Sequence, residues 1–223
     1  MTRSARRLAD CPLVIFIAYT LPADAEGRGY CPWLERVDNP FFNSRPGVHH
    51  YANWRLGQVL SGTAPGWDWF DFEGLAAAED LEAVWFDPAL DEFRAEWIRL
   101  WGYGPRDART APVLANSYVM RPAAPASAVA AAERAVFVAG FGAPPAGGAI
   151  FRLEGVLPKH FAAPAGTPRP DDWYRPVADG NPLGFDWLGL VADIDAVPAG
   201  AAFVAEAIRV AAPDRSAQKG DQA

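Results

Sequence analysis

Residues 66–74, GWDWFDFEG, place three carboxylates among four aromatic rings. Successive side chains of a strand point to opposite faces, and carboxylates grouped on one face could accept and return protons. The face expected to be available for chemistry holds Trp67, Trp69, Asp71 and Glu73. The opposite face is expected to hold Asp68, Phe70 and Phe72.

A second polar set lies in residues 45–57, RPGVHHYANWRLG, which begin with a Pro-Gly turn and read as the preceding strand. Its polar face would hold His49, Tyr51, Asn53 and Arg55, and its other face Val48, His50, Ala52, Trp54 and Leu56. Helices that pack on a sheet require an apolar surface beneath them. We therefore expect the second set, with Phe70 and Phe72, under helices, and the polar set in a cavity.

A cavity lined in this way could transfer protons on an anion held by Arg55. An unperturbed histidine titrates near a pKa of about 6.5, so the ring of His49 suits this chemistry, with a carboxylate to orient it. The candidate catalytic residues are His49, Tyr51, Asp71 and Glu73. The candidate substrate-binding residues are Tyr19, Asn53, Arg55, Trp69 and Trp187. His50 is the alternative catalytic residue, because a β-bulge at the start of the strand would exchange the two histidines.

Each candidate also has a structural interpretation. A strand histidine is more often exposed or hydrogen-bonded than catalytic, and Asp71 and Glu73 could form an ion pair with Arg55. Asp68, and Asp186 at the matching position of a similar stretch later in the chain, are expected to be structural hydrogen-bond acceptors at the starts of strands. Nine tryptophans invite a glycosidase interpretation, which is weaker because helical packing accounts for several of them.

The expected elements alternate in type along the first part of the chain. Strands are expected at residues 13–21, 45–57, 66–75 and 114–121, with a short helical segment at 32–37 and a helical region at 77–101. Asp87 and Pro88 predict an N-cap followed by proline at the first helical position, hence a break and a second helix. Further strands are expected at 134–142, 149–157, 184–194 and 202–210, with an Ala/Pro-rich connector at 122–132, a loop at 162–182 and a frayed tail after residue 212.

A short internal echo links the two parts of the chain. Residues 66–70, GWDWF, recur as residues 184–188, GFDWL, each at the start of the third expected strand of its half. The echo indicates an internal repeat.

Three stretches resemble the dimeric α/β-barrel superfamily, the ferredoxin-like group that includes EthD-like proteins. They are the first strand LVIFIAYTL, the entry PGVHHY to the second strand, and the helical region EDLEAVWFDPALDEFRAEW. The resemblance covers residues 12–121. It implies an α+β fold of ferredoxin-like antiparallel sheets, in which a second, degenerate half at 133–212 closes on the first as a pseudo-dimer around a cavity.

Members of this group are often cofactor-free enzymes acting on small aromatic or polyketide-like molecules, and some bind haem. The resemblance therefore implies a cofactor-independent isomerase or lyase, acting by proton transfer on a small anionic aromatic or ring-fission product in aromatic-compound catabolism. Two alternatives stay open, a non-catalytic small-molecule binding protein and a haem-dependent relative.

Composition and charge limit the kinds of molecule that this protein is expected to bind. A net charge of −7, without a basic cluster beyond the first residues, makes nucleic acid an unlikely partner. Three histidines without metal-ligand spacing and two cysteines favour neither a metal site nor a disulfide framework. The apolar run at residues 13–21 favours a buried strand over a signal peptide, and no run reaches membrane-spanning length. We expect a cytoplasmic protein with a small-molecule substrate, no cofactor and no membrane partner; a homodimer stays open.

Overall fold

The computed structural model describes residues 7–102, 116–123, 133–157, 172–179 and 181–212. The strands are β1 (Leu13–Tyr19), β2 (Val48–Ser61), β3 (Trp69–Leu75), β4 (Asn116–Pro122), β5 (Arg134–Gly140), β6 (Ala149–Leu157), β7 (Arg175–Pro176), β8 (Trp187–Val191) and β9 (Phe203–Ala211). The α-helices are α1 (Tyr30–Trp33), α2 (Asn39–Asn43), α3 (Leu81–Trp85) and α4 (Pro88–Trp101), and a π-helical turn, η2 (Leu34–Asp38), joins α1 to α2. Short 3-10 turns are η1 (Leu8–Asp10), η3 (Ala78–Asp80), η5 (Val177–Asp179) and η6 (Ile194–Ala196).

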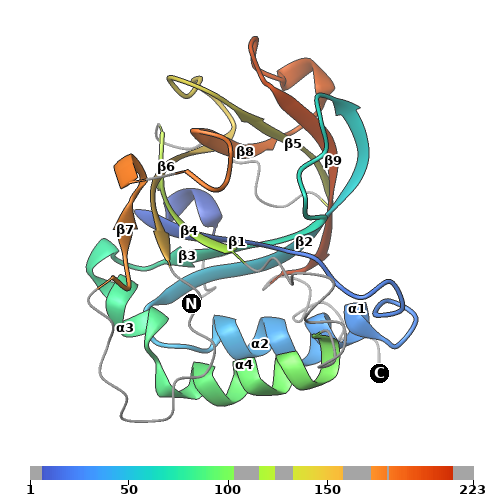
Figure 1. The fold of residues 1–223 in the computed structure, drawn as a ribbon, viewed down its shortest axis with the longest axis vertical. Coiled ribbons are helices and arrows are strands. Elements are labelled where there is room, and N and C mark those ends of the chain that lie inside the picture. The colour runs from blue at the N-terminus through green and yellow to red at the C-terminus, as the bar shows by residue number, and fades with distance from the viewer. Residues whose placement is uncertain (1–6, 103–115, 124–132, 158–171, 180, 213–223) are drawn as a thin grey trace, which may run out of the picture.

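Eight antiparallel strands form a closed barrel (Figure 1). Their order is β4-β1-β3-β2-β9-β5-β8-β6, and β6 pairs with β4 to close the sheet. The two-residue strand β7 extends β6 on one side. Closure leaves none of the eight long strands as a free sheet edge along its whole length.

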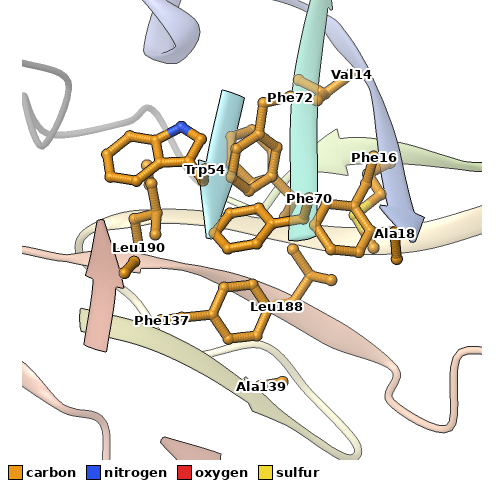
Figure 2. Packing of buried hydrophobic residues seen from close by; sticks show 14 of the residues in the cluster. Val14, Phe16, Ala18, Trp54, Phe70, Phe72, Phe137, Ala139, Leu188 and Leu190 are labelled. Carbon is orange, nitrogen blue, oxygen red and sulfur yellow. The ribbon is translucent and has the colours of Figure 1, made fainter. Parts of the chain in front are cut away.

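Side chains from opposite walls fill the barrel interior. Phe137 of β5 lies 5.1 Å from Phe70 of β3, and Phe72 lies 5.6 Å from Phe151 of β6, measured between ring centroids. Figure 2 shows the rings of β1 and β3 meeting Phe137 and Leu188 from the far wall. An eight-stranded barrel is just wide enough for side chains to pack it solid.

The described α-helices lie on one side of the barrel. In Figure 1, α2 and α4 lie together against the side formed by β1, β2 and β3, away from β5 and β8. The break predicted at Asp87 is present: its side chain accepts a hydrogen bond from the backbone of Ala89, and α4 starts with Pro88. In the described part of the chain after β4, the only helical elements are the 3-10 turns η5 and η6.

The expected fold class is therefore wrong, and so is the assignment to the dimeric α/β-barrel superfamily. The chain is a mostly-β closed barrel rather than an α+β pseudo-dimer of ferredoxin-like halves. A short loop joins β5 to β6, where the first half has room for α1, η2 and α2. Apolar side chains from both halves pack in the interior, where a cavity was expected. The expected link to aromatic-compound catabolism rested on the resemblance and is withdrawn with it.

The predicted orientation of the strand faces is also wrong. Ala52, Trp54, Phe70 and Phe72 point into the barrel, whereas Tyr51, Asn53, Asp71 and Glu73 lie on the helix-covered outer side. Trp67, expected beside Trp69, lies outside β3 and packs inside the barrel on Phe16. The interior of a closed barrel demands the more apolar face of each strand, so the polar face is left for the helices.

The echo between residues 66–70 and 184–188 marks equivalent positions. Trp69 opens β3 between Tyr19 and Arg55, and Trp187 opens β8 between Gly140 and Arg152. The backbone of Leu56 donates to Asp68, as that of Leu153 donates to Asp186. The repeat therefore extends to strand register, and a Cβ at Gly140 would collide with the ring of Trp187. Tyr19 in the first half corresponds to Gly140 in the second, and the glycine leaves room for the ring of Trp187.

Candidate functional site

Three rows of side chains on the outer side of β1, β3 and β2 contain most of the buried polar groups of this face. Cross-strand pairing defines the rows as Ile15–Glu73–Tyr51, Ile17–Asp71–Asn53 and Tyr19–Trp69–Arg55. Asn53 is 0% exposed, Glu73 2% and Asp71 5%. A helix-covered sheet face normally presents apolar side chains, so these buried polar groups require partners.

The segment from α1 to α2, which packs on this outer face, supplies hydrogen-bond partners for these groups. The π-helical turn η2 ends at Asp38, and α2 begins at Asn39 with Pro40 in its first turn. Both Asp38 and Asn39 are buried, at 3% and 5% exposed. Single π-helical turns occur often at functional sites. Here the turn ends on the first of two consecutive polar residues that are both buried.

Three asparagines connect α2 to β2. Asn43 accepts from the backbone N–H of Tyr51 at 3.0 Å and donates to its carbonyl at 3.0 Å, as a neighbouring strand would. The pairing of β2 with β9 ends at Asn53, so none of the described strands pairs with β2 at Tyr51 on that side. Asn43 also donates to the side-chain oxygen of Asn39 at 2.9 Å, and Asn39 donates to that of Asn53 at 3.1 Å. This Asn43–Asn39–Asn53 series defines the orientation of each amide.

Asp71 is the centre of the network. Its Oδ1 accepts from Asn53 at 3.0 Å and from the hydroxyl of Tyr19 at 3.3 Å, and its Oδ2 accepts from the hydroxyl of Tyr51 at 3.0 Å. The same amide nitrogen of Asn53 donates to Oδ2 of Asp38 at 2.8 Å. We refer to Asp38, Tyr51, Asn53 and Asp71 as the Asp71 cluster.

Burial perturbs the carboxyl groups. It raises the pKa of Asp38 to about 7, against the effect of hydrogen bonds with Asn53 and Tyr51. Burial, followed by the charge of Asp38, raises the pKa of Asp71, and its three donors oppose the rise. Burial raises the pKa of Glu73 to about 7, opposed by the charge of Arg94. Carboxyl groups whose pKa is raised by burial are candidates for general acid–base chemistry.

An aromatic shell encloses the Asp71 cluster on the side of α1 and α4. The indole N–H of Trp97 donates to the hydroxyl of Tyr30 at 3.3 Å, which donates to that of Tyr19 at 3.0 Å. The ring centroid of Tyr30 lies 5.1 Å from that of Trp69. Burial, followed by the charge of Asp71, raises the pKa of Tyr19, so its hydroxyl stays protonated and donates. The series of donors ends at Asp71.

Glu73 borders the Asp71 cluster without joining it. Its Oε1 is buried and has no hydrogen-bond partner among the described residues. Against the effect of burial, the charge of Arg94 on α4 lowers the pKa of Glu73. The Arg94 guanidinium lies 4.6 Å from the ring centroid of Trp85 and donates to the Trp85 carbonyl. Glu73 is thus a second carboxyl that burial favours in its neutral form.

Six of the predicted site residues come together here: Tyr19, Tyr51, Asn53, Trp69, Asp71 and Glu73. They meet beneath the helices rather than in the expected cavity.

The other four predicted residues lie elsewhere. A bulge between Val48 and His50 leaves His49 as the extra residue of β2. The charge of His49 contributes to lowering the pKa of Asp10, which lies outside the Asp71 cluster. His50 shares the inward face of Ala52. Arg55 is 39% exposed and pairs with Glu26 at 3.1 Å. Trp187 lies on the opposite side of the barrel and donates to the carbonyl of Phe141.

The sequence interpretation missed the residues that the helices contribute. These are Tyr30, Asp38, Asn39, Asn43, Arg94 and Trp97. The spacing of Asn39 and Asn43, four residues apart, places both on one side of a helix and was a usable signal. The remaining members have no such pattern.

No family model, curated protein or solved structure matches the chain. Within the described ranges, no group of three or more histidine, cysteine, aspartate and glutamate side chains could hold a metal ion. In the same ranges, no helix is both long and apolar enough to cross a membrane. The geometry of the Asp71 cluster is therefore the basis for proposing a function.

Proposed function

We propose that this protein is an acid–base enzyme that uses its own side chains to move a proton to and from a small molecule, with Asp71 as the base. The observation that carries the proposal is the position of Asp71, a buried carboxylate that accepts from Tyr19, Tyr51 and Asn53 and shares an amide donor with a second carboxyl. Isomerisation and elimination are the reactions that such a transfer accomplishes without further groups.

The proposed substrate is small and uncharged. Three carboxyl groups lie in or beside the site, and Arg55, the expected anion-binding residue, is paired with Glu26. The carboxyl groups would therefore repel an anionic substrate, and no unpaired cation among the predicted site residues would offset that repulsion. Aromatic rings of Tyr19, Tyr30 and Trp69 surround Asp71 and favour a flat, unsaturated molecule.

Access requires movement of the aromatic cover. Asp71 is 5% exposed, so a substrate reaches it only when part of the shell formed by α1 and α4 is displaced. The proposed enzyme acts in the cytoplasm, and the described cysteines, Cys11 and Cys31, are both unpaired thiols.

The test measures proton exchange at carbon. The protein is incubated in D2O with a set of small uncharged carbonyl compounds, and deuterium incorporation beside the carbonyl is followed by proton NMR. The wild type should exceed the protein-free rate with at least one compound, and Asp71→Asn should lower that rate by about 100-fold or more, the usual contribution of a general base.

Asp186→Asn is the matched control, since Asp186 is the echo of Asp68 and lies with Trp187 away from the Asp71 cluster. Its exchange rate should equal that of the wild type. Exchange that survives Asp71→Asn in a folded variant would remove Asp71 from the mechanism. A wild type that exchanges no compound of the set would count against the proposal itself.

A further inference from the structure

We infer that Asn53 is a positioning residue that holds Asp38 and Asp71 as a pair sharing one proton, with the proton on Asp38 and the negative charge on Asp71 in the resting protein. The inference deepens the proposed function, because it assigns the resting state of the proposed base. It rests on the hydrogen-bond geometry around Asn53.

The orientation of the Asn53 amide follows from the backbone of Tyr51. The Tyr51 N–H can only donate and its carbonyl can only accept, so Asn43 must present oxygen to the first and nitrogen to the second. Asn43 then donates to the oxygen of Asn39, and Asn39 to the oxygen of Asn53. The Asn53 amide nitrogen is left to face the two carboxyl groups, Asp38 at 2.8 Å and Asp71 at 3.0 Å, with the Tyr51 hydroxyl as a longer contact at 3.2 Å.

The number of donors decides where the negative charge lies. Asp71 accepts from two tyrosine hydroxyls as well as from Asn53, and an ionised carboxylate is an acceptor only. Hydrogen bonds to the charged form favour that form. Asp38 accepts from Asn53, and although it also hydrogen-bonds Tyr51, the single hydroxyl proton of Tyr51 is directed at Asp71, so Asp38 is the less stabilised anion.

Two adjacent buried carboxylates without a cation between them cannot both stay ionised at low cost. The titratable and charged groups that face the pair are Tyr19 from β1, Tyr30 from α1, Tyr51 from β2, Glu73 from β3 and Arg94 from α4. The cation Arg94 acts on Glu73, which lies one row away from Asp71, and Arg55, in the row on the other side, is paired with Glu26. One shared proton is the arrangement that this environment favours.

The pair gives the proposed enzyme both an acid and a base. When Asp71 takes a proton from carbon, a C–H bond breaks and an O–H bond forms, and the pair then holds two protons. Asp38 can return its own proton to a different atom of the substrate, which leaves one proton, now on Asp71. The Tyr51 hydroxyl, which hydrogen-bonds both carboxyl groups, can pass a proton from Asp71 to Asp38 and restore the resting state. Atoms and charge balance without any further reactant.

The experiment reads the proton directly by infrared spectroscopy. The full chain is labelled with carbon-13 at the aspartate side-chain carboxyl, so that the carboxylic-acid band of aspartate separates from that of Glu73. Near pH 6, exposed aspartates are ionised, since their reference pKa is about 3.9. The wild type should show the band of one protonated aspartate.

Isosteric variants locate the proton. The band should disappear in Asp38→Asn, where Asp71 alone keeps its donors, and should persist in Asp71→Asn. Asn53→Leu removes both amide donors, so Asp71 should take up a proton and the band should double in intensity. Glu73→Gln is the matched control and should leave the aspartate band unchanged.

A band that persists in Asp38→Asn and disappears in Asp71→Asn would place the proton on the wrong carboxyl and overturn the inference. A wild type with no protonated aspartate, or with two, would overturn the shared proton. Circular dichroism confirms that each variant is folded, and the two isosteric variants decide the question even if Asn53→Leu does not fold. No substrate is needed, so this result is separate from success or failure of the exchange assay.

Discussion

At the scale of single residues, the carboxyl groups of this protein lie in an unusual environment. Asp38, Asp71 and Glu73 are at most 5% exposed, yet they lie against a sheet face that helices cover. Burial disfavours the charged form of each, and donors from tyrosine and asparagine recover part of that cost only for Asp38 and Asp71. Such groups make folding sensitive to pH.

We predict that the free energy of unfolding falls as pH rises from about 4 to about 7. The folded-state pKa values of Asp38 and Glu73, raised to about 7 by burial, exceed the unfolded values of roughly 4, so the folded state binds more protons in this interval. Each group then lowers stability by up to about 1.4 kcal/mol per pH unit. Urea titrations at pH 5 and pH 8 measure the difference.

Asp38→Asn and Glu73→Gln should flatten this dependence, because each removes one buried proton-binding group. Glu92→Gln, an exposed carboxyl on α4, is the control and should retain the wild-type slope. A wild type that becomes more stable between pH 5 and pH 8 would contradict the prediction.

At the scale of elements, α2 hydrogen-bonds β2 just beyond the point where the pairing of β2 with β9 ends. The β9 partner of β2 ends opposite Asn53, and Asn43 satisfies the backbone of Tyr51 in its place. The helix therefore attaches to the barrel through hydrogen bonds as well as through stacking of Phe42 on Tyr51, whose ring centroids lie 4.2 Å apart. The site depends on this attachment, because α2 and η2 carry Asn39 and Asp38.

Asn43→Ala should destabilise the protein by about 1–3 kcal/mol, the usual cost of leaving a buried polar group without its partner. It removes the acceptor of the Tyr51 N–H and the group that orients Asn39. Denaturant unfolding gives the change, with Gln58→Ala on the exposed end of β2 as the control, expected within about 0.5 kcal/mol of the wild type. A loss no larger than that of the control would mean that α2 is held by apolar contacts alone.

At the scale of the whole molecule, both halves of the chain build one core. Phe16 of β1 packs on Phe137 of β5 at 6.2 Å between ring centroids, and Phe137 packs on Phe203 of β9 at 6.0 Å. The strands repeat their order and register between the halves, but neither half buries its inward face without the other. We therefore expect the barrel to unfold as a unit.

Phe137→Ala should lower the free energy of unfolding by about 3–5 kcal/mol, because it empties a fully buried position that both halves contact. Phe141→Ala, four residues later and 62% exposed, should cost less than about 1 kcal/mol. Chemical denaturation followed by tryptophan fluorescence and circular dichroism should show a single transition for the wild type and both variants. Two separate transitions would show that the halves are independent.

Local sequence determined where most elements lie and which residues share a strand face. Alternation within β2 and β3 grouped Tyr51 with Asn53 and Asp71 with Glu73, the Asp87–Pro88 pair marked the start of α4, and the echo at Trp69 and Trp187 marked equivalent strands. These features depend on neighbours along the chain, and the sequence displays them directly.

Tertiary structure alone decided which face of each strand is the interior and which residues complete the site. Alternation separates two faces but does not say what covers them, and a closed barrel takes the apolar face that a flat sheet would offer to its helices. Asp38 reaches Asn53, 15 residues later, and Asn53 reaches Asp71, 18 residues later, because β2 pairs with β3 while α2 folds back over both. Contacts between separate elements have no local pattern, so the Asp71 cluster exists only once the barrel has closed and the helices have packed on its side.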